Sequence, residues 1–186
     1  MTNTRYFNYH GTPDNIQVFL DMDGVFSNFE GYFLEKLGKP TSELSGNELW
    51  GYIGKEIADG NPVFENFEPF KYVEMIWEVF KKYNPIFLSS TGFSNFQKIA
   101  TQKQNWLNKH IGKGTNTVAL FTKLSKNKAK YAYPNAILID DREKSLGPWR
   151  EAGGIGVKWD SKNPVNSMAD FLEVYLEIKD KMQKDA

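Results

Sequence analysis

Short apolar runs recur along the chain and are separated by longer stretches with helical spacing. Most of the runs follow proline, glycine or asparagine breakers. Apolar runs of this length, without polar alternation, are typical of strands that are buried on both faces of a sheet. We therefore predict strands over residues 17–20, 85–88, 118–121, 136–139 and 156–159.

Three of the intervening stretches carry apolar residues three or four positions apart, which predicts helices over residues 70–83, 94–110 and 168–182. The second helix has Ile99, Lys103 and Trp106 along one face. Strands that alternate with helices indicate right-handed crossovers and a parallel sheet. We therefore predict an α/β fold with a Rossmann-like, three-layer parallel sheet.

One interval is too long for a simple crossover. The segment after Phe29 continues to Asn84, whereas a crossover needs on the order of a dozen residues plus its loops. We predict that residues 29–83 form a small helical cap inserted after the first strand. Residues 1–28 and 84–186 would form the catalytic core.

Composition excludes several classes of site. Lys plus Arg and Asp plus Glu are 23 each, so no overall field attracts nucleic acid or an anionic membrane. Cysteine is absent, and His10 and His110 are the only histidines, so thiolate chemistry and His-rich metal sites are excluded. No apolar stretch is long enough to span a membrane and the first ten residues do not resemble a signal peptide, so we expect a cytoplasmic protein. Aromatic residues are 15% of the chain.

Acidic and hydroxyl side chains follow three of the predicted strands. They are Asp21 and Asp23 after the first strand, Ser89, Ser90 and Thr91 after the second, and Asp140 and Asp141 after the fourth. The carboxyl ends of parallel strands meet at one edge of a sheet, where such folds bind ligands. Carboxylates gathered there repel one another unless a cation lies between them, and Mg²⁺ is suited to such oxygen ligands.

The run Asp21-Met22-Asp23-Gly24-Val25 resembles the first motif of the haloacid-dehalogenase-like (HAD) phosphatases, and the later blocks follow in that family's order. The resemblance covers about residues 16–160. It implies that Asp21 is a nucleophile that forms an aspartyl-phosphate, and that Asp23 is the general acid and base. It also implies that Gly24 lets the chain turn away from the phosphate.

The remaining motifs of the family fall on a hydroxyl, a lysine and an acidic pair. Ser90 is our first choice for the hydroxyl, with Ser89 and Thr91 as neighbours. Lys130 fits the lysine spacing best, although Lys126 and Lys128 stay open. The implied phosphate-binding residues are Asp21, Met22, Asp23, Gly24, Ser90, Thr91 and Lys130. The implied Mg²⁺ ligands are Asp21, the Asp23 carbonyl, Asp140 and Asp141.

Within the family, the chain resembles the 5′(3′)-deoxyribonucleotidase branch, on the run from Ala136 to Arg142 and on residues 61–70 and 149–154. This resemblance implies a small phosphate ester as substrate, foremost a nucleoside monophosphate. A nucleobase needs an apolar slot, and the cap is rich in aromatic residues, several of which would form its own core. Our candidates for facing the substrate are Phe29, Trp50, Phe64 and Phe67.

Two alternatives stay open. A polynucleotide 3′-phosphatase would use the same motifs, but the neutral charge argues against it, because strand binding usually adds a basic groove. We therefore expect no stable nucleic-acid binding. A catalytically inactive scaffold is the other alternative, and the joint presence of all four motifs speaks against it. Whether the chain forms a homodimer is left open.

Overall fold

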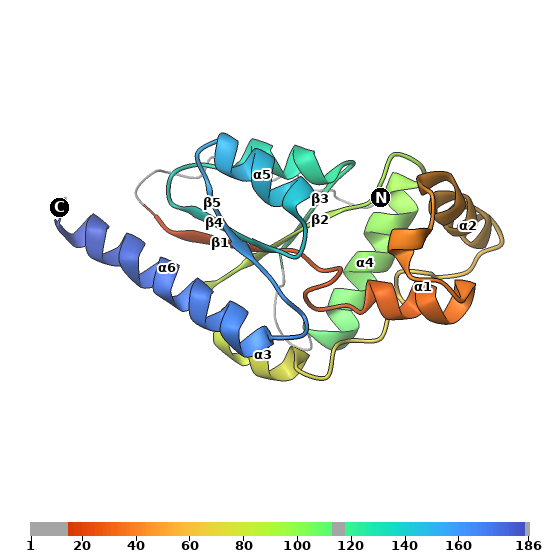
Figure 1. Cartoon of the computed structure of the whole chain (residues 1–186), viewed down its shortest axis with the longest axis horizontal. Coiled ribbons are helices and arrows are strands. Elements are labelled where there is room, and N and C mark those ends of the chain that lie inside the picture. Colours follow the sequence, from red (N-terminus) through yellow and green to blue (C-terminus); the bar gives the residue numbers. More distant parts are fainter. Residues whose placement is uncertain (1–14, 113–117, 185–186) are drawn as a thin grey trace, which may run out of the picture.

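Five parallel strands form one sheet in the order β3-β2-β1-β4-β5 in the computed structural model, which describes residues 15–112 and 118–184 (Figure 1). The strands are β1 (Gln17–Leu20), β2 (Ile86–Ser90), β3 (Ala119–Thr122), β4 (Ala136–Asp140) and β5 (Ile155–Lys158). The predicted α/β fold with an all-parallel sheet is therefore confirmed, and each predicted strand lies within two residues of an observed one. β1 lies at the centre, paired with β2 on one side and β4 on the other.

Helices connect and flank the strands. The α-helices are α1 (Phe29–Leu37), α2 (Gly46–Ala58), α3 (Val73–Phe80), α4 (Phe96–His110), α5 (Glu143–Glu151) and α6 (Pro164–Lys184). Three 3₁₀-helices are also present in the described chain: η1 (Thr41–Glu43), η2 (Lys81–Tyr83) and η3 (Ser125–Tyr131). The pattern of apolar positions did not predict α5. This helix contains Gly147 and has Pro148 in its interior.

The sheet buries both faces, which makes the fold three layers. Val18 and Leu20 of β1 point to the side covered by α3, α4 and α6. Phe19, between them in sequence, points to the opposite side and packs against Trp149 of α5, with ring centroids 5.3 Å apart. This alternation explains why successive residues of β1 from Val18 to Leu20 are all apolar: neighbouring side chains enter different cores.

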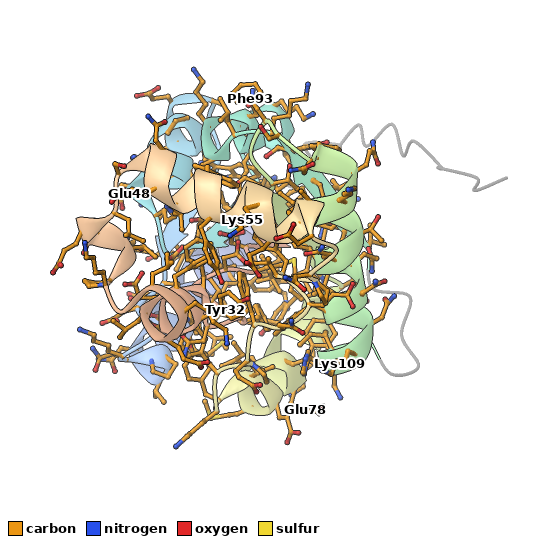
Figure 2. The ribbon with its side chains drawn as sticks, turned by 90° about the vertical axis from the view of Figure 1, so that its right-hand side faces the viewer. Tyr32, Glu48, Lys55, Glu78, Phe93 and Lys109 are labelled. Carbon is orange, nitrogen blue, oxygen red and sulfur yellow. The ribbon has the colours of Figure 1, made fainter. Side chains whose placement is uncertain are left out.

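Helices α1 and α2 lie beside α4, next to the carboxyl ends of the strands (Figures 1 and 2). Hydrogen bonds hold the segment that returns from α2 to helix α4. Trp106 Nε1 donates to the Phe67 carbonyl at 2.7 Å, and the Phe64 amide donates to Gln102 Oε1 at 3.0 Å. These bonds fix the proposed cap over one edge of the sheet.

Helix α3 closes the proposed cap segment 29–83 but packs against the sheet. Trp77 contacts Phe87 of β2 with ring centroids 5.8 Å apart, and Phe80 contacts Phe171 of α6 at 5.0 Å. The division at residues 28/29 and 83/84 stays a proposal, and residues 1–14 of the proposed core lie outside the described residues. Throughout the described ranges, no helix combines the length and apolar character needed to cross a bilayer.

Candidate active site

The loop after β1 brings its acidic residues to the centre of the sheet edge. The Asp21 amide donates to the Ile139 carbonyl at 2.9 Å, which extends the pairing of β1 and β4 by one residue. The Met22 carbonyl then accepts from the amides of Val25, Phe26 and Ser27, at 3.3, 2.8 and 3.0 Å. Three donors on one carbonyl close a tight turn, so Asp21 is held at the end of the strand.

Gly24 occupies a position that only glycine can fill without strain. Its φ is +82°, in the left-handed region, and a Cβ there would collide with the carboxylate of Asp141. The resemblance implied that Gly24 keeps a side chain out of the phosphate's path. In the structure, the group closest to a Cβ on Gly24 would be the Asp141 carboxylate. Gly24 therefore allows the loops after β1 and β4 to approach each other.

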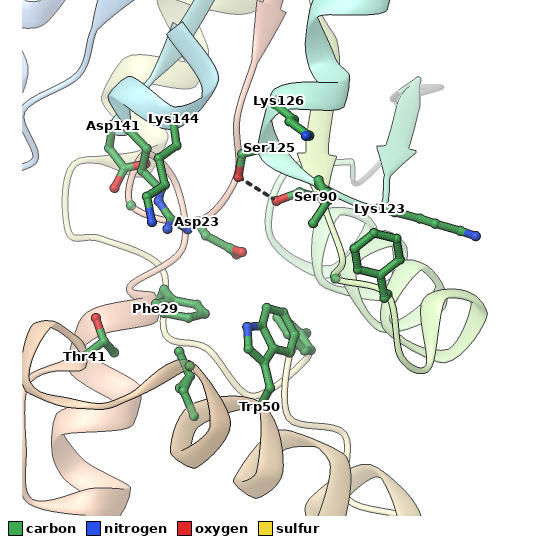
Figure 3. A pocket seen from close by; sticks show the side chains of 18 of the residues that line it. Asp23, Phe29, Thr41, Trp50, Ser90, Lys123, Ser125, Lys126, Asp141 and Lys144 are labelled. Atoms are coloured by element: carbon green, nitrogen blue, oxygen red, sulfur yellow. Dashed lines mark hydrogen bonds between the residues drawn. The ribbon is translucent and has the colours of Figure 1, made fainter. Parts of the chain in front are cut away.

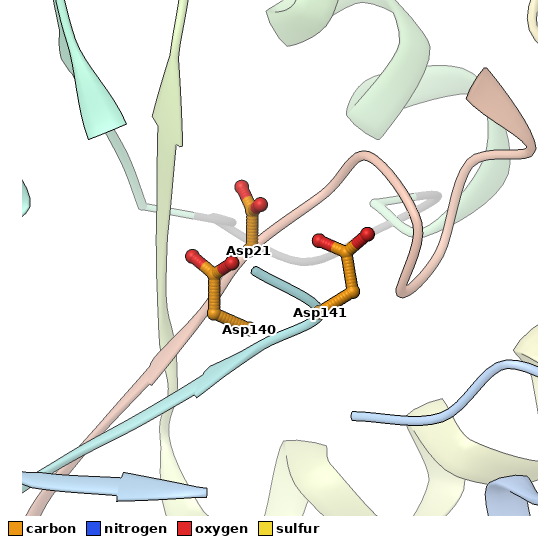
Figure 4. A group of neighbouring side chains, drawn as sticks. All are labelled: Asp21, Asp140 and Asp141. Atoms are coloured by element: carbon orange, nitrogen blue, oxygen red, sulfur yellow. The ribbon is translucent and has the colours of Figure 1, made fainter. Parts of the chain in front are cut away.

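Three carboxylates converge where β1 and β4 end (Figure 4). Asp21, Asp140 and Asp141 each present an oxygen within 4.8 Å of the others. The Lys128 Nζ lies 2.8 Å from Asp21 Oδ1 and 2.6 Å from Asp140 Oδ2, and this lysine is only 1% exposed. The second oxygen of Asp140 accepts from the Arg142 amide at 2.9 Å. One buried ammonium therefore bridges two of the three carboxylates.

The environment shifts the pKa of each carboxyl group differently. Burial raises the pKa of Asp21, but the charges of Lys128 and Lys103 outweigh burial and hold it below its ordinary value. Burial raises the pKa of Asp140, and Lys128 only partly offsets this. Burial and the charges of Asp21 and Asp140 raise the pKa of Asp141 to about 8. Asp141, which forms no ion pair with Lys128, therefore has a raised pKa.

The structure places Lys128, and not Lys130, at the carboxylates. The two lysines lie on η3, where residues three apart share a face because a 3₁₀-helix has three residues per turn. Lys128 therefore points the same way as Ser125, toward the site, while the exposed Lys130 lies with its Nζ 4.9 Å from the ring centroid of Tyr131. Lys128 replaces Lys130 as our candidate for the motif lysine.

The three hydroxyl candidates at the carboxyl end of β2, Ser89, Ser90 and Thr91, point to different places. Ser90 lines a cavity beside the carboxylates, and its hydroxyl oxygen lies 3.4 Å from that of Ser125 (Figure 3). The buried Ser89 accepts from Lys103, and the buried Thr91 donates to the carbonyls of Gly92 and Thr122. Only Ser90 of these three is among the residues that line the pocket.

Asp23 has a cationic partner that sequence reasoning did not assign. The Lys103 Nζ lies 2.5 Å from Asp23 Oδ2 and 2.9 Å from the Ser89 hydroxyl, and Lys103 is 1% exposed. The Ser27 hydroxyl donates to the other oxygen, Asp23 Oδ1, at 3.0 Å. The sequence held one sign of this contact: Lys103 lies on the apolar face of the predicted helix, between Ile99 and Trp106. A charged side chain is rarely buried on such a face without a partner of opposite charge.

A cavity of about 950 Å³ opens above these residues, between the core and α2. Phe29, Trp50 and Phe64 contribute aromatic surface to it (Figure 3). Phe67 does not line the cavity. It is 2% exposed and packs against four neighbouring rings, so it belongs to the core of the cap segment.

The carboxylates fit a hard divalent cation. Asp141 Oδ1 is buried and has no hydrogen-bond partner among the described residues, and two further carboxylates lie within reach of the same point. Buried, unpaired carboxylate oxygen is costly without a cation or a proton. Asp21, Asp140 and Asp141 could therefore hold Mg²⁺, which prefers oxygen ligands and keeps several waters.

Comparison with known proteins finds distant similarity to hydrolases of known structure. No protein-family model and no curated protein matches the sequence. A haloacid-dehalogenase-like hydrolase from Streptococcus pneumoniae is 12% identical, with 84% of this chain and 92% of that chain covered and a TM-score of 0.49. A HAD-superfamily hydrolase from Ehrlichia chaffeensis is 13% identical, with 86% and 97% covered and a TM-score of 0.47.

Proposed function

We propose that the chain is a HAD-like phosphomonoesterase that acts through an aspartyl-phosphate. One observation carries the proposal: the buried Lys128 bridges Asp21 and Asp140 beside Asp141, with Asp23 two residues further along the same loop. A carboxylate whose pKa is held low by a cation stays ionised and can attack phosphorus. The arrangement supplies a nucleophile, an acid and base, and positive charge at a single point.

The reaction divides into two displacements at phosphorus. A carboxylate oxygen of Asp21 forms a bond to phosphorus as the bond to the ester oxygen breaks, and Asp23 gives its proton to the departing oxygen. Asp23 then takes a proton from water, whose oxygen attacks phosphorus and releases Asp21 and phosphate. Ser90 and the amides after Asp21 bind the phosphoryl oxygens, and Lys128 neutralises charge on Asp21.

Mg²⁺ held by Asp21, the Asp23 carbonyl, Asp140 and Asp141 would lower the repulsion between the phosphate and these carboxylates. Side chains of the protein would orient the general acid and bind the phosphoryl oxygens. Lys103 and Ser27 each bind one oxygen of Asp23, so the carboxyl group that exchanges the proton keeps a fixed orientation. Fixed orientation of a general acid is what makes its proton transfer effective.

The substrate that we propose is a deoxyribonucleoside or ribonucleoside monophosphate. The cavity has room for a nucleoside and offers Phe29, Trp50 and Phe64 as apolar surface for a flat base. Ser90 and Asp23 line the same cavity, so a bound base and a reacting phosphate would share one opening.

The test is phosphate release from a panel of nucleoside monophosphates, with and without Mg²⁺. We expect Mg²⁺-dependent release by the wild type and none by Asp21→Asn, which keeps the size of the side chain but removes its charge. An aryl phosphate serves as a generic substrate. If the wild type and Asp21→Asn are indistinguishable on every compound, the chain is not this enzyme and the inactive scaffold is favoured.

A further inference from the structure

Four cationic side chains line the cavity and have no part in the proposed chemistry. Lys123 lies just after β3 and Lys126 near the start of η3, while Arg142 is the N-cap of α5 and Lys144 lies in its first turn. We refer to these four residues as the cationic rim. Lys144 lies near Asp141 and Asp23, and Lys126 lies on the other side, near Ser125 and Ser90 (Figure 3). The chain as a whole has no net charge, so the rim is a local concentration of positive charge.

Nearby acidic groups do not neutralise the cationic rim. None of its four residues forms an ion pair within the described parts of the chain. Of the acidic residues that line the cavity, Asp23 is bound to Lys103, and Glu30 accepts from the amide and hydroxyl of Thr41. The third, Asp141, belongs to the carboxylate cluster. The four rim residues therefore keep exposed positive charge at the opening of the cavity, where an anion could bind.

The start of α5 increases this imbalance. Arg142 is the N-cap of a nine-residue helix and its side chain makes no capping hydrogen bond, while Lys144 lies in the first turn. Cations are unfavourable at this end of a helix, where the dipole and the free amides attract anions. The acidic residue of the first turn, Glu143, is turned toward Arg150 and bonds it at 2.9 Å. The positive end of the α5 dipole and the side chains of Arg142 and Lys144 thus favour an anion on this side of the cavity.

An anion bound at the cationic rim would be distinct from the reacting phosphate. The reacting phosphate is served by the buried Lys128 and by the carboxylate cluster that can hold Mg²⁺, whereas the rim residues are exposed at the opening. We infer that the cationic rim binds a second phosphate of the substrate, an inference that rests on the proposed function. The second phosphate would belong to a nucleoside bisphosphate or to the phosphodiester next to a terminal phosphate.

Binding to Asp21→Asn tests the inference without turnover. Calorimetry in the presence of Mg²⁺ would compare a nucleoside 5′-monophosphate with the corresponding 3′,5′-bisphosphate. We expect about tenfold tighter binding of the bisphosphate, the order given by two or three partly exposed charge contacts. In Arg142→Gln/Lys144→Gln the ratio of the two Kd values should fall to near one, and rising salt should reduce it in the parent.

Lys179→Gln/Lys181→Gln is the matched control, because it removes the same charge from exposed positions near the end of α6. This control should keep the tenfold ratio. Equal Kd values for the two nucleotides in the parent, or a ratio that persists in the rim variant, would overturn the inference.

Two further measurements identify the molecule that carries the second phosphate and distinguish failure of this inference from failure of the proposed function. Tighter binding of a 3′-phosphorylated dinucleotide than of the bisphosphate, lost in the rim variant, would assign the rim to a phosphodiester and support a polynucleotide 3′-phosphatase. The reverse order would assign it to a free bisphosphate. If the wild type releases no phosphate from any compound while the binding ratio persists, the proposed function fails and the second-phosphate site stands.

Discussion

Lys103 is the residue whose replacement gives the sharpest test of how Asp23 works. It is almost fully buried, and its ammonium contacts only Asp23 and Ser89 among the hydrogen bonds and ion pairs of the described chain. Methionine has a similar length and no charge. Lys103→Met therefore leaves the helix face filled and removes the two contacts together.

The size of the effect follows from those contacts. The charged hydrogen bond to Asp23 is worth about 1.5–3 kcal/mol and the bond to Ser89 about 0.5–1.5 kcal/mol. Methionine also removes the cost of burying an ammonium, so we expect the free energy of unfolding to fall by only about 1–3 kcal/mol. Asp23 is 22% exposed and can regain water, which keeps the loss within this range.

The effect on catalysis should depend on the leaving group. General acid catalysis contributes about 10²–10⁴-fold, and a misoriented Asp23 should lose about 10–100-fold of this in kcat/KM for a nucleoside monophosphate, whose alkoxide is a poor leaving group. An aryl phosphate leaves without a proton, and Lys128, the larger of the two charges that act on Asp21, is retained, so kcat/KM for this substrate should change by less than about threefold. Steady-state phosphate release from both substrates measures the contrast.

Lys98→Met is the matched control, since Lys98 lies on the same helix but is exposed. It should leave both values of kcat/KM unchanged. Equal losses on the two substrates in Lys103→Met would show a general structural defect, and no loss on either would show that Lys103 does not position Asp23. Either result would refute the reasoning.

Three other changes test the carboxylate cluster. Lys128→Met should abolish phosphate release and lower the free energy of unfolding by about 3–5 kcal/mol without Mg²⁺, because it leaves buried charges unpaired; urea unfolding measures this. The pKa of Asp141 is raised to about 8, so the metal-free folded state keeps a proton that the unfolded state loses above pH ~4. Stability should therefore fall from pH 5 to pH 8 in EDTA, and less so in Asp141→Asn. Gly24→Ala should lower Tm and weaken Mg²⁺ binding in a titration, since its Cβ displaces Asp141; unchanged Mg²⁺ affinity would contradict this.

The sequence predicted the central strands clearly because β1, β2 and β4 are buried along most of their length and carry apolar runs, whereas the runs at the partly buried β3 and β5 are weaker. It also predicted where the acidic residues gather, since parallel strands end at the same edge. The partner of each acidic residue could not be predicted. Lys128 and Lys130 differ only in their direction from a 3₁₀-helix, and the contact of Lys103 with Asp23 joins residues 80 positions apart. Such contacts depend on the path of the chain rather than on local pattern.

The packing of Trp50 against Gly92 has a consequence for anyone who wishes to change the substrate range of this protein. A Cβ on Gly92 would lie 2.8 Å from the Trp50 ring, and Gly92 follows Ser90 and Thr91 in the loop after β2. Enlarging the cavity at Trp50 would therefore also loosen the loop that presents the Ser90 hydroxyl. Leu44 and Leu49 line the same cavity without that constraint, which makes them the better starting positions for redesign.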